Sequence, residues 1–112
     1  MPRVNVPVTQ ITRTGTPDTT PTVGDAVNNH SVANDGSMWI EAENTGAVSR
    51  TVSALFVNAV DGVTVDPRTW AIPAGARRRI GPFPVRLYGA MLQVNVDNAE
   101  LELSAYRVAG QA

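Results

Sequence analysis

Apolar and polar residues alternate along several stretches of this chain, and that alternation constrains the fold more than any other feature. Side chains of a β-strand point alternately to opposite faces, so a spacing of two gathers the apolar members of each stretch on one sheet face. Half-buried strands of this kind are typical of antiparallel sheets. The apolar members are Val4, Val6 and Val8, then Met38, Ile40 and Ala42, then Leu92, Val94 and Val96, and finally Leu101, Leu103 and Ala105.

Short turn motifs separate these stretches and support a strand-and-turn fold. Asp61-Gly62 lies between the apolar runs Leu55–Val60 and Val63–Val65, and Asp-Gly in that position predicts a tight hairpin. Further turns are predicted at Asn34-Asp35-Gly36, Pro73-Ala74-Gly75 and Asp97-Asn98-Ala99.

The composition agrees, because 16 Val and 11 Thr among 112 residues favour strands over helices. We therefore predict an all-β fold in which residues 1–112 form one domain, an antiparallel β-sandwich. We count about eight candidate strands, the number in a jelly roll, and therefore expect a jelly-roll-like sandwich. An immunoglobulin-like sandwich has the same alternation, so the strand order is left open.

The N-terminal segment departs from this pattern. Thr12–Thr22 contains six Thr, two Pro and one Gly, without a periodic apolar face, which predicts an extended loop. Residues 1–22 are interpreted either as a surface loop or as an arm that orders against a partner. If they form an arm, its predicted interface residues are Val4, Val6, Val8 and Arg13.

Several classes of chemistry are excluded by what the sequence lacks. The chain has no cysteine and no lysine, so disulfides, thiol nucleophiles, Cys-ligated zinc, a P-loop lysine and Schiff-base chemistry are ruled out. Ten acidic and nine basic residues give a net charge of −1, which argues against a nucleic-acid partner. No apolar run approaches the roughly 20 residues of a membrane helix or the core of a signal peptide, so we expect neither a membrane partner nor secretion.

The ionisable residues do not form a recognisable catalytic or metal site. Glu41 and Glu43 share one strand face, as do Glu100 and Glu102, but a general acid needs an apolar pocket, and these positions alternate with the buried ones. The single histidine, His30, has no nucleophile motif beside it and no metal-ligand spacing. We predict no catalytic residue, no cofactor and no metal, and hence no enzyme.

The run Arg77-Arg78-Arg79 and the residue Trp39 are further candidates for an interface. On a strand, Arg77 and Arg79 point one way and Arg78 the other, beside Ile80. The run is either a contact surface for a partner or an edge strand protected by charge against stray pairing. Trp39 falls on the polar phase of its strand, which indicates an interface anchor, a core residue or a platform for a sugar.

Three stretches together resemble the small β-sandwich virion proteins of tailed bacteriophages, particularly phages of actinobacterial hosts. They are NDGSMWIEAENTG at residues 34–46, followed by Arg50-Thr51-Val52; IPAGARRRIGPFP at residues 72–84; and VNVDNAEL at residues 94–101, continuing to AYRV at residues 105–108. The resemblance covers residues 34–108 and carries no catalytic motif from which residues could be transferred.

The resemblance implies a capsid decoration protein that binds the outer surface of the major capsid protein shell and stabilises it. We expect a homo-oligomer, with a trimer as one form, assembled in the bacterial cytoplasm and located on the capsid surface of the virion. The alternatives are a head–tail connector, a tail or fibre-associated virion protein, and a carbohydrate- or receptor-binding sandwich that uses Trp39 or Tyr88.

Overall fold

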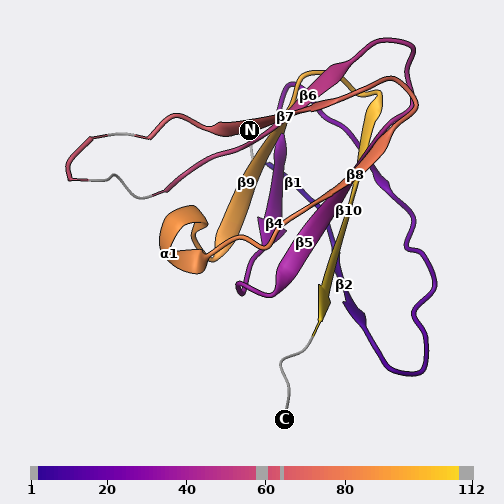
Figure 1. Cartoon of the computed structure of the whole chain (residues 1–112), viewed down its shortest axis with the longest axis horizontal. Helices are drawn as coiled ribbons and strands as arrows, with labels where there is room; N and C mark the ends of the chain where they lie inside the picture. The colour runs from indigo at the N-terminus through magenta and orange to yellow at the C-terminus, as the bar shows by residue number, and fades with distance from the viewer. Residues whose placement is uncertain (1–2, 58–60, 64, 109–112) are drawn as a thin grey trace.

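Two β-sheets pack face to face in the computed structural model, which describes residues 3–57, 61–63 and 65–108 (Figure 1). The first sheet has the order β1 (Val4–Asn5), β4 (His30–Ala33), β9 (Met91–Val96), β6 (Arg50–Ala54) and β7 (Arg68–Ile72). The second has the order β2 (Val8–Ile11), β10 (Leu101–Val108), β5 (Met38–Asn44) and β8 (Arg77–Ile80), and β3 (Thr22–Val23) also pairs with β10. One short helix, α1 (Val85–Tyr88), precedes β9.

The strand order is that of a jelly roll, which confirms the predicted fold class. Strands β3 to β10 form two four-stranded arrays, β3-β10-β5-β8 and β4-β9-β6-β7, in which every pair is antiparallel. Each connection crosses to the opposite sheet except the one from β6 to β7. These eight strands are joined by two more, β1 and β2, from the N-terminal segment, which gives ten strands in the described residues.

The alternating stretches supply the core between the sheets, as their pattern predicts. Met38, Ile40 and Ala42 of β5 are fully buried, and so are the corresponding residues of β9 and β10. One end of the core is filled by aromatic rings: Phe83 packs edge-on against Tyr88, with ring centroids 5.0 Å apart, and Phe56 stacks on the same Tyr88 at 4.7 Å.

The N-terminal segment differs from its prediction, because residues 4–8 do not form one strand. Val4 lies on β1, parallel to β4 in the first sheet, whereas Val8 begins β2, parallel to β10 in the second. Pro7 has no N–H to contribute to a ladder and breaks the strand between them. Val6, at this crossing, is only 1% exposed, and its N–H donates to the Ser31 carbonyl at 2.9 Å.

The Asp61-Gly62 turn is confirmed, but the strands expected beside it are not found in the described residues. Asp61 and Gly62 both have positive φ angles, 52° and 79°, as a two-residue hairpin turn requires. However, β6 ends at Ala54 and β7 begins only at Arg68, so the turn belongs to a long connection. Residues 58–60 and 64 of the predicted runs lie outside the described residues.

Candidate functional site

The outer face of the second sheet carries a regular array of polar and aromatic side chains. The polar phases of β5 and β10 bring Glu43 opposite Glu102, Glu41 opposite Ser104, and Trp39 opposite Tyr106. On the other side of β5, the register places Arg77 and Arg79 of β8 opposite the same two β5 glutamates. Alternation along three neighbouring strands therefore gathers three carboxylates, two guanidinium groups and two rings on one face.

Arginines of β8 form a ladder of ion pairs with the glutamates of β5. Arg77 contacts Glu41 at 3.2 Å and Glu43 at 3.0 Å, and Arg79 contacts Glu41 at 3.0 Å. The hydrogen bond to Glu43, followed by the charges of Glu43 and Glu41, raises the pKa of the Arg77 guanidinium further. Arg77 and Arg79 share a face as predicted, but their charges are compensated within the chain.

Arg78 points away from this ladder and is exposed on β8. Because β8 is the last strand of its sheet, a run of three arginines there places charge along an unpaired edge, which disfavours pairing with another chain. The structure thus favours edge protection over a basic docking patch for the Arg77–Arg79 run.

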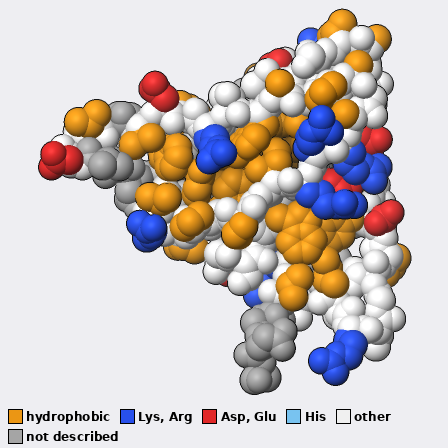
Figure 2. All heavy atoms as spheres, viewed as in Figure 1, with side chains coloured by type: hydrophobic (Ala, Val, Ile, Leu, Met, Phe, Trp, Pro, Cys, Tyr) orange, Lys and Arg blue, Asp and Glu red, His pale blue; other side chains and the backbone are white. Residues whose placement is uncertain are grey.

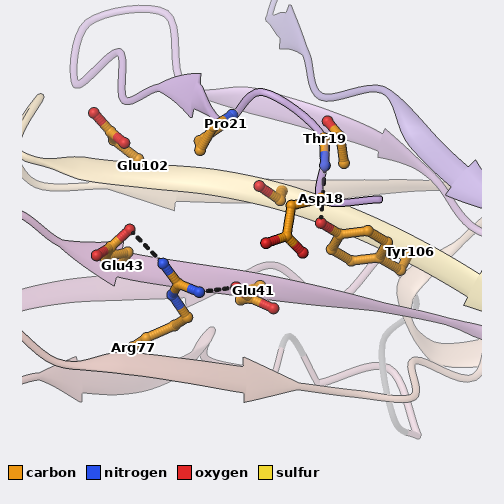
Figure 3. Close-up of a pocket in the computed structure, with 9 residues that line it drawn as sticks. Asp18, Thr19, Pro21, Glu41, Glu43, Arg77, Glu102 and Tyr106 are labelled. Carbon is orange, nitrogen blue, oxygen red and sulfur yellow. Dashed lines mark hydrogen bonds and ion pairs between the residues drawn. The ribbon is translucent and has the colours of Figure 1, made fainter. Parts of the chain in front are cut away.

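The Thr-rich loop of residues 12–21 lies over this polar face and closes a hollow, which we call the acidic pocket (Figure 3). The Thr19 N–H donates to the Tyr106 hydroxyl oxygen at 3.3 Å and ties the loop to β10. The pocket measures about 220 Å³ and is lined by Asp18, Thr19 and Pro21 of the loop, Glu41 and Glu43 of β5, Arg77 of β8, and Glu102, Ser104 and Tyr106 of β10.

Trp39 lies beside the acidic pocket and is partly buried. Its ring stacks on Tyr106, with centroids 6.0 Å apart and planes inclined by 29°. Two more open hollows adjoin it, one under Thr12–Asp18 of the loop and one against Pro82. Trp39 therefore belongs to the outer face of the second sheet and not to the core between the sheets.

The remaining predicted interface residues are not brought together with Trp39 and the arginines. Val4 and Val8 are half-buried at the edges of opposite sheets, and Arg13 is exposed on the Thr-rich loop. Val6 is a core residue, so its assignment to an interface is wrong: its side chain is already covered by the sandwich.

His30 is fully buried where β4 begins. Its Nε2 accepts a hydrogen bond from the Asp25 N–H at 2.9 Å, which fixes the turn before the strand. Burial lowers the pKa of the His30 imidazole; the Val4 backbone and the Asp25 carboxylate oppose this effect, and Arg3 adds to it. These contacts agree with a structural histidine.

Two other sequence interpretations need correction. Glu100 does not share a strand with Glu102, because β10 begins at Leu101; Glu100 instead forms a 2.8 Å ion pair with Arg50. Tyr88 is only 6% exposed and packed between aromatic rings, so it cannot serve as a sugar platform.

The acidic pocket itself was not predicted from the sequence. The outward phase of Glu102, Ser104 and Tyr106 was readable from the alternation around them, but nothing in the sequence indicated that Asp18 would lie above them. Across the described ranges, no group of three or more His, Asp or Glu side chains is placed to hold a metal ion.

No helix in the described part of the chain has the length and apolar character needed to cross a membrane.

No protein-family model matches the sequence, and comparison with curated proteins and with solved structures found no similar protein.

Proposed function

We propose that this chain is a non-enzymatic structural protein of a phage virion, which decorates the capsid by binding the outer surface of the major capsid protein shell. The resemblance of residues 34–108 to small virion proteins is one support for this proposal. The jelly-roll sandwich is a second, weaker support by analogy, since viral capsid domains are among the proteins that use it.

The main structural support for a binding role is an exposed apolar surface around α1. We call it the α1 patch, formed by Val57, Val85 and Met91, whose exposed fractions are 46%, 41% and 48%. Val57 lies against this helix, because its N–H donates to the Leu87 carbonyl at 3.0 Å. Val85 lies on α1, and Met91 begins β9, which lies beside α1. Exposed apolar residues near one another on a surface are typical of sites that another protein covers.

The shape of the molecule suits attachment to a shell. Figure 2 shows hydrophobic side chains across the left and middle of the view, including the side on which α1 lies in Figure 1, and a second cluster right of centre. The molecule extends 45 × 42 × 25 Å, so it is a thin plate with a wide face for its mass. Many copies of such a plate on one lattice, each with a modest interface, would stabilise the shell together.

The test is co-sedimentation of the purified chain with undecorated shells of the source phage, with bound copies counted against the major capsid protein. Saturation near about one copy per shell subunit is expected, as multivalent coverage of a lattice requires. Saturation at only a few copies per shell would move the chain to a connector or tail position. Absence of binding would overturn the virion-decoration proposal.

A matched pair of variants connects that test to the α1 patch. Met91→Glu places a charge in the patch at the start of β9. Val27→Glu places one in the turn before Asn29, whose side chain accepts from the Val96 N–H at the other end of that strand, and the Val27 side chain is 86% exposed. We expect Met91→Glu to reduce the number of bound copies and Val27→Glu to leave it unchanged. Circular dichroism verifies that both variants are folded.

A further inference from the structure

The charges that line the acidic pocket do not balance. Four carboxylates, those of Asp18, Glu41, Glu43 and Glu102, face one guanidinium group, that of Arg77. Arg77 forms ion pairs with both Glu41 and Glu43. Within the described residues, by contrast, neither Asp18 nor Glu102 has an ion pair or a side-chain hydrogen bond. The charge of Asp18 helps to raise the pKa of Arg77 without an ion pair between them, and Glu102 has no cationic partner among the described residues.

The position of Glu102 costs stability in the chain as it stands. Glu102 lies directly opposite Glu43 in the ladder between β10 and β5, and like charges in directly opposed positions destabilise a sheet. The ion pair with Arg77 relieves this repulsion on the side of Glu43 only. A second cation placed between Glu102 and Asp18 would remove the repulsion that remains at Glu102.

An unpaired hydroxyl group independently indicates a ligand. Ser104 lies between Glu102 and Tyr106 on the pocket side of β10, and its exposed fraction is only 8%. No hydrogen-bond partner for its hydroxyl is found among the described residues. Its oxygen is not one of the fully buried, unpaired side-chain atoms of the described residues, so the hydroxyl opens into the pocket and lacks a partner there. A ligand that donates hydrogen bonds into the pocket would supply it.

The size of the pocket limits the ligand to one small group. About 220 Å³ is below the roughly 300–1,000 Å³ of typical small-molecule sites. In Figure 3, Asp18 enters from the loop, while Glu43 and Glu102 stand on neighbouring strands around the same space. Two carboxylates and a hydroxyl group provide acceptors in several directions, which matches the planar fork of five donors that a guanidinium group carries.

We propose that the acidic pocket binds the guanidinium group of an arginine side chain, presented by a segment of a partner protein. Carboxylates of Asp18 and Glu102 accept its charge-assisted hydrogen bonds, and the Ser104 hydroxyl accepts a further one. A neutral sugar would leave both carboxylates without an ion pair. This site goes beyond the proposed function: it lies on the outer face of the second sheet and is defined by its chemistry, whichever surface the α1 patch contacts.

The test is a titration of the full chain with N-acetyl-arginine amide, followed by NMR, in parallel with N-acetyl-citrulline amide. Citrulline has almost the same shape but no charge, so we expect it to bind about tenfold more weakly or less. Glu102→Gln keeps the shape of the side chain and should also weaken arginine binding about tenfold. Glu100→Gln is the matched control, because Glu100 is paired with Arg50 outside the pocket, and it should leave the affinity unchanged.

Three outcomes would overturn this assignment: no saturable binding of the arginine amide, equal affinity for citrulline, or equal losses in the two glutamine variants. Displacement of the arginine amide by a neutral oligosaccharide would overturn it in favour of a sugar site. The titration contains no shells, so its result is independent of the capsid experiment. Glu102→Gln also removes a like-charge pair and should unfold at no lower urea concentration than the wild type, which excludes misfolding as the cause of weaker binding.

Discussion

Asn44 shows how one buried polar side chain holds a corner of the sandwich. It is fully buried at the end of β5; its Nδ2 donates to the Val48 and Ile72 carbonyls at 2.7 and 2.9 Å, and its Oδ1 accepts from the Gly46 N–H at 2.9 Å. These bonds join the loop after β5 to the end of β7 in the other sheet. Asn44 continues the buried phase of Met38, Ile40 and Ala42, so its burial follows the local period, whereas its partners depend on the position of β7 in the other sheet.

His30 is the residue whose ionisation matters most for stability near neutral pH. It is fully buried and accepts the Asp25 N–H through Nε2, a bond that protonation of this nitrogen would abolish. The charged groups that act on the ring are the Asp25 carboxylate, which favours its protonated form, and Arg3, which disfavours it. Burial is the largest effect, and it keeps the pKa of His30 below its ordinary value of 6.5.

The lowered pKa of His30 predicts a loss of stability on mild acidification. As the pH falls below about 6.5, the unfolded chain binds the proton before the folded chain does, so the free energy of unfolding decreases. The decrease is at most about 1.4 kcal/mol per pH unit and ends once the folded histidine also titrates. The Asp25 and Asp35 carboxyls have lowered pKa values as well, but they act only below about pH 4. Urea unfolding between pH 7.5 and 5.0 measures the effect. His30→Asn should flatten the profile, and an equally steep profile in that variant would contradict this explanation.

At the scale of elements, the N-terminal segment closes one side of the sandwich. It runs in parallel beside β4 and then beside β10, at the edges of both sheets, and inserts Val6 between them. Arg107 of β10 donates to Gln10 of β2 at 2.6 Å. Removing this segment would therefore open the core. A deletion of residues 2–20 would impair folding, so a loss of binding in that variant could not be assigned to a lost interface.

Substitutions in the N-terminal segment separate these two roles. Val6→Ala removes buried methyl groups and should lower the free energy of unfolding by roughly 2–3 kcal/mol. Val4→Ala, at a half-buried position of β1, should cost less than about 1 kcal/mol. Chemical denaturation of both variants measures the difference. Similar small losses for both would show that the segment is not part of the core.

Strand positions were more predictable than strand partners. The alternation correctly identified the buried faces of β5, β9 and β10, because local periodicity reports which side chains face the core. It could not show that Glu41 and Glu43 would face Arg77 and Arg79, since that pairing depends on β8 returning beside β5. Pro7 was visible in the sequence, and its effect on the ladder could have split the segment 4–8 into two strands.

On the scale of the whole molecule, the sandwich class followed from the sequence but the strand order did not. Six of the seven connections between β3 and β10 cross between the sheets, and such long-range pairings leave no periodic signal in the chain. The acidic pocket depends on the same kind of contact, because loop 12–21 covers strands that lie far along the sequence. Alternation therefore predicted which side chains share a sheet face. Which strands lie next to each other, and which loop covers them, depends on the topology of the whole chain.

The most direct test of the virion role is to count this chain in purified particles of the source phage. Quantitative mass spectrometry with labelled peptides gives its ratio to the major capsid protein. A capsid decoration protein should be present at about one copy per capsid subunit, since it covers the lattice of the shell. Absence of the chain from purified particles would contradict a role in the virion.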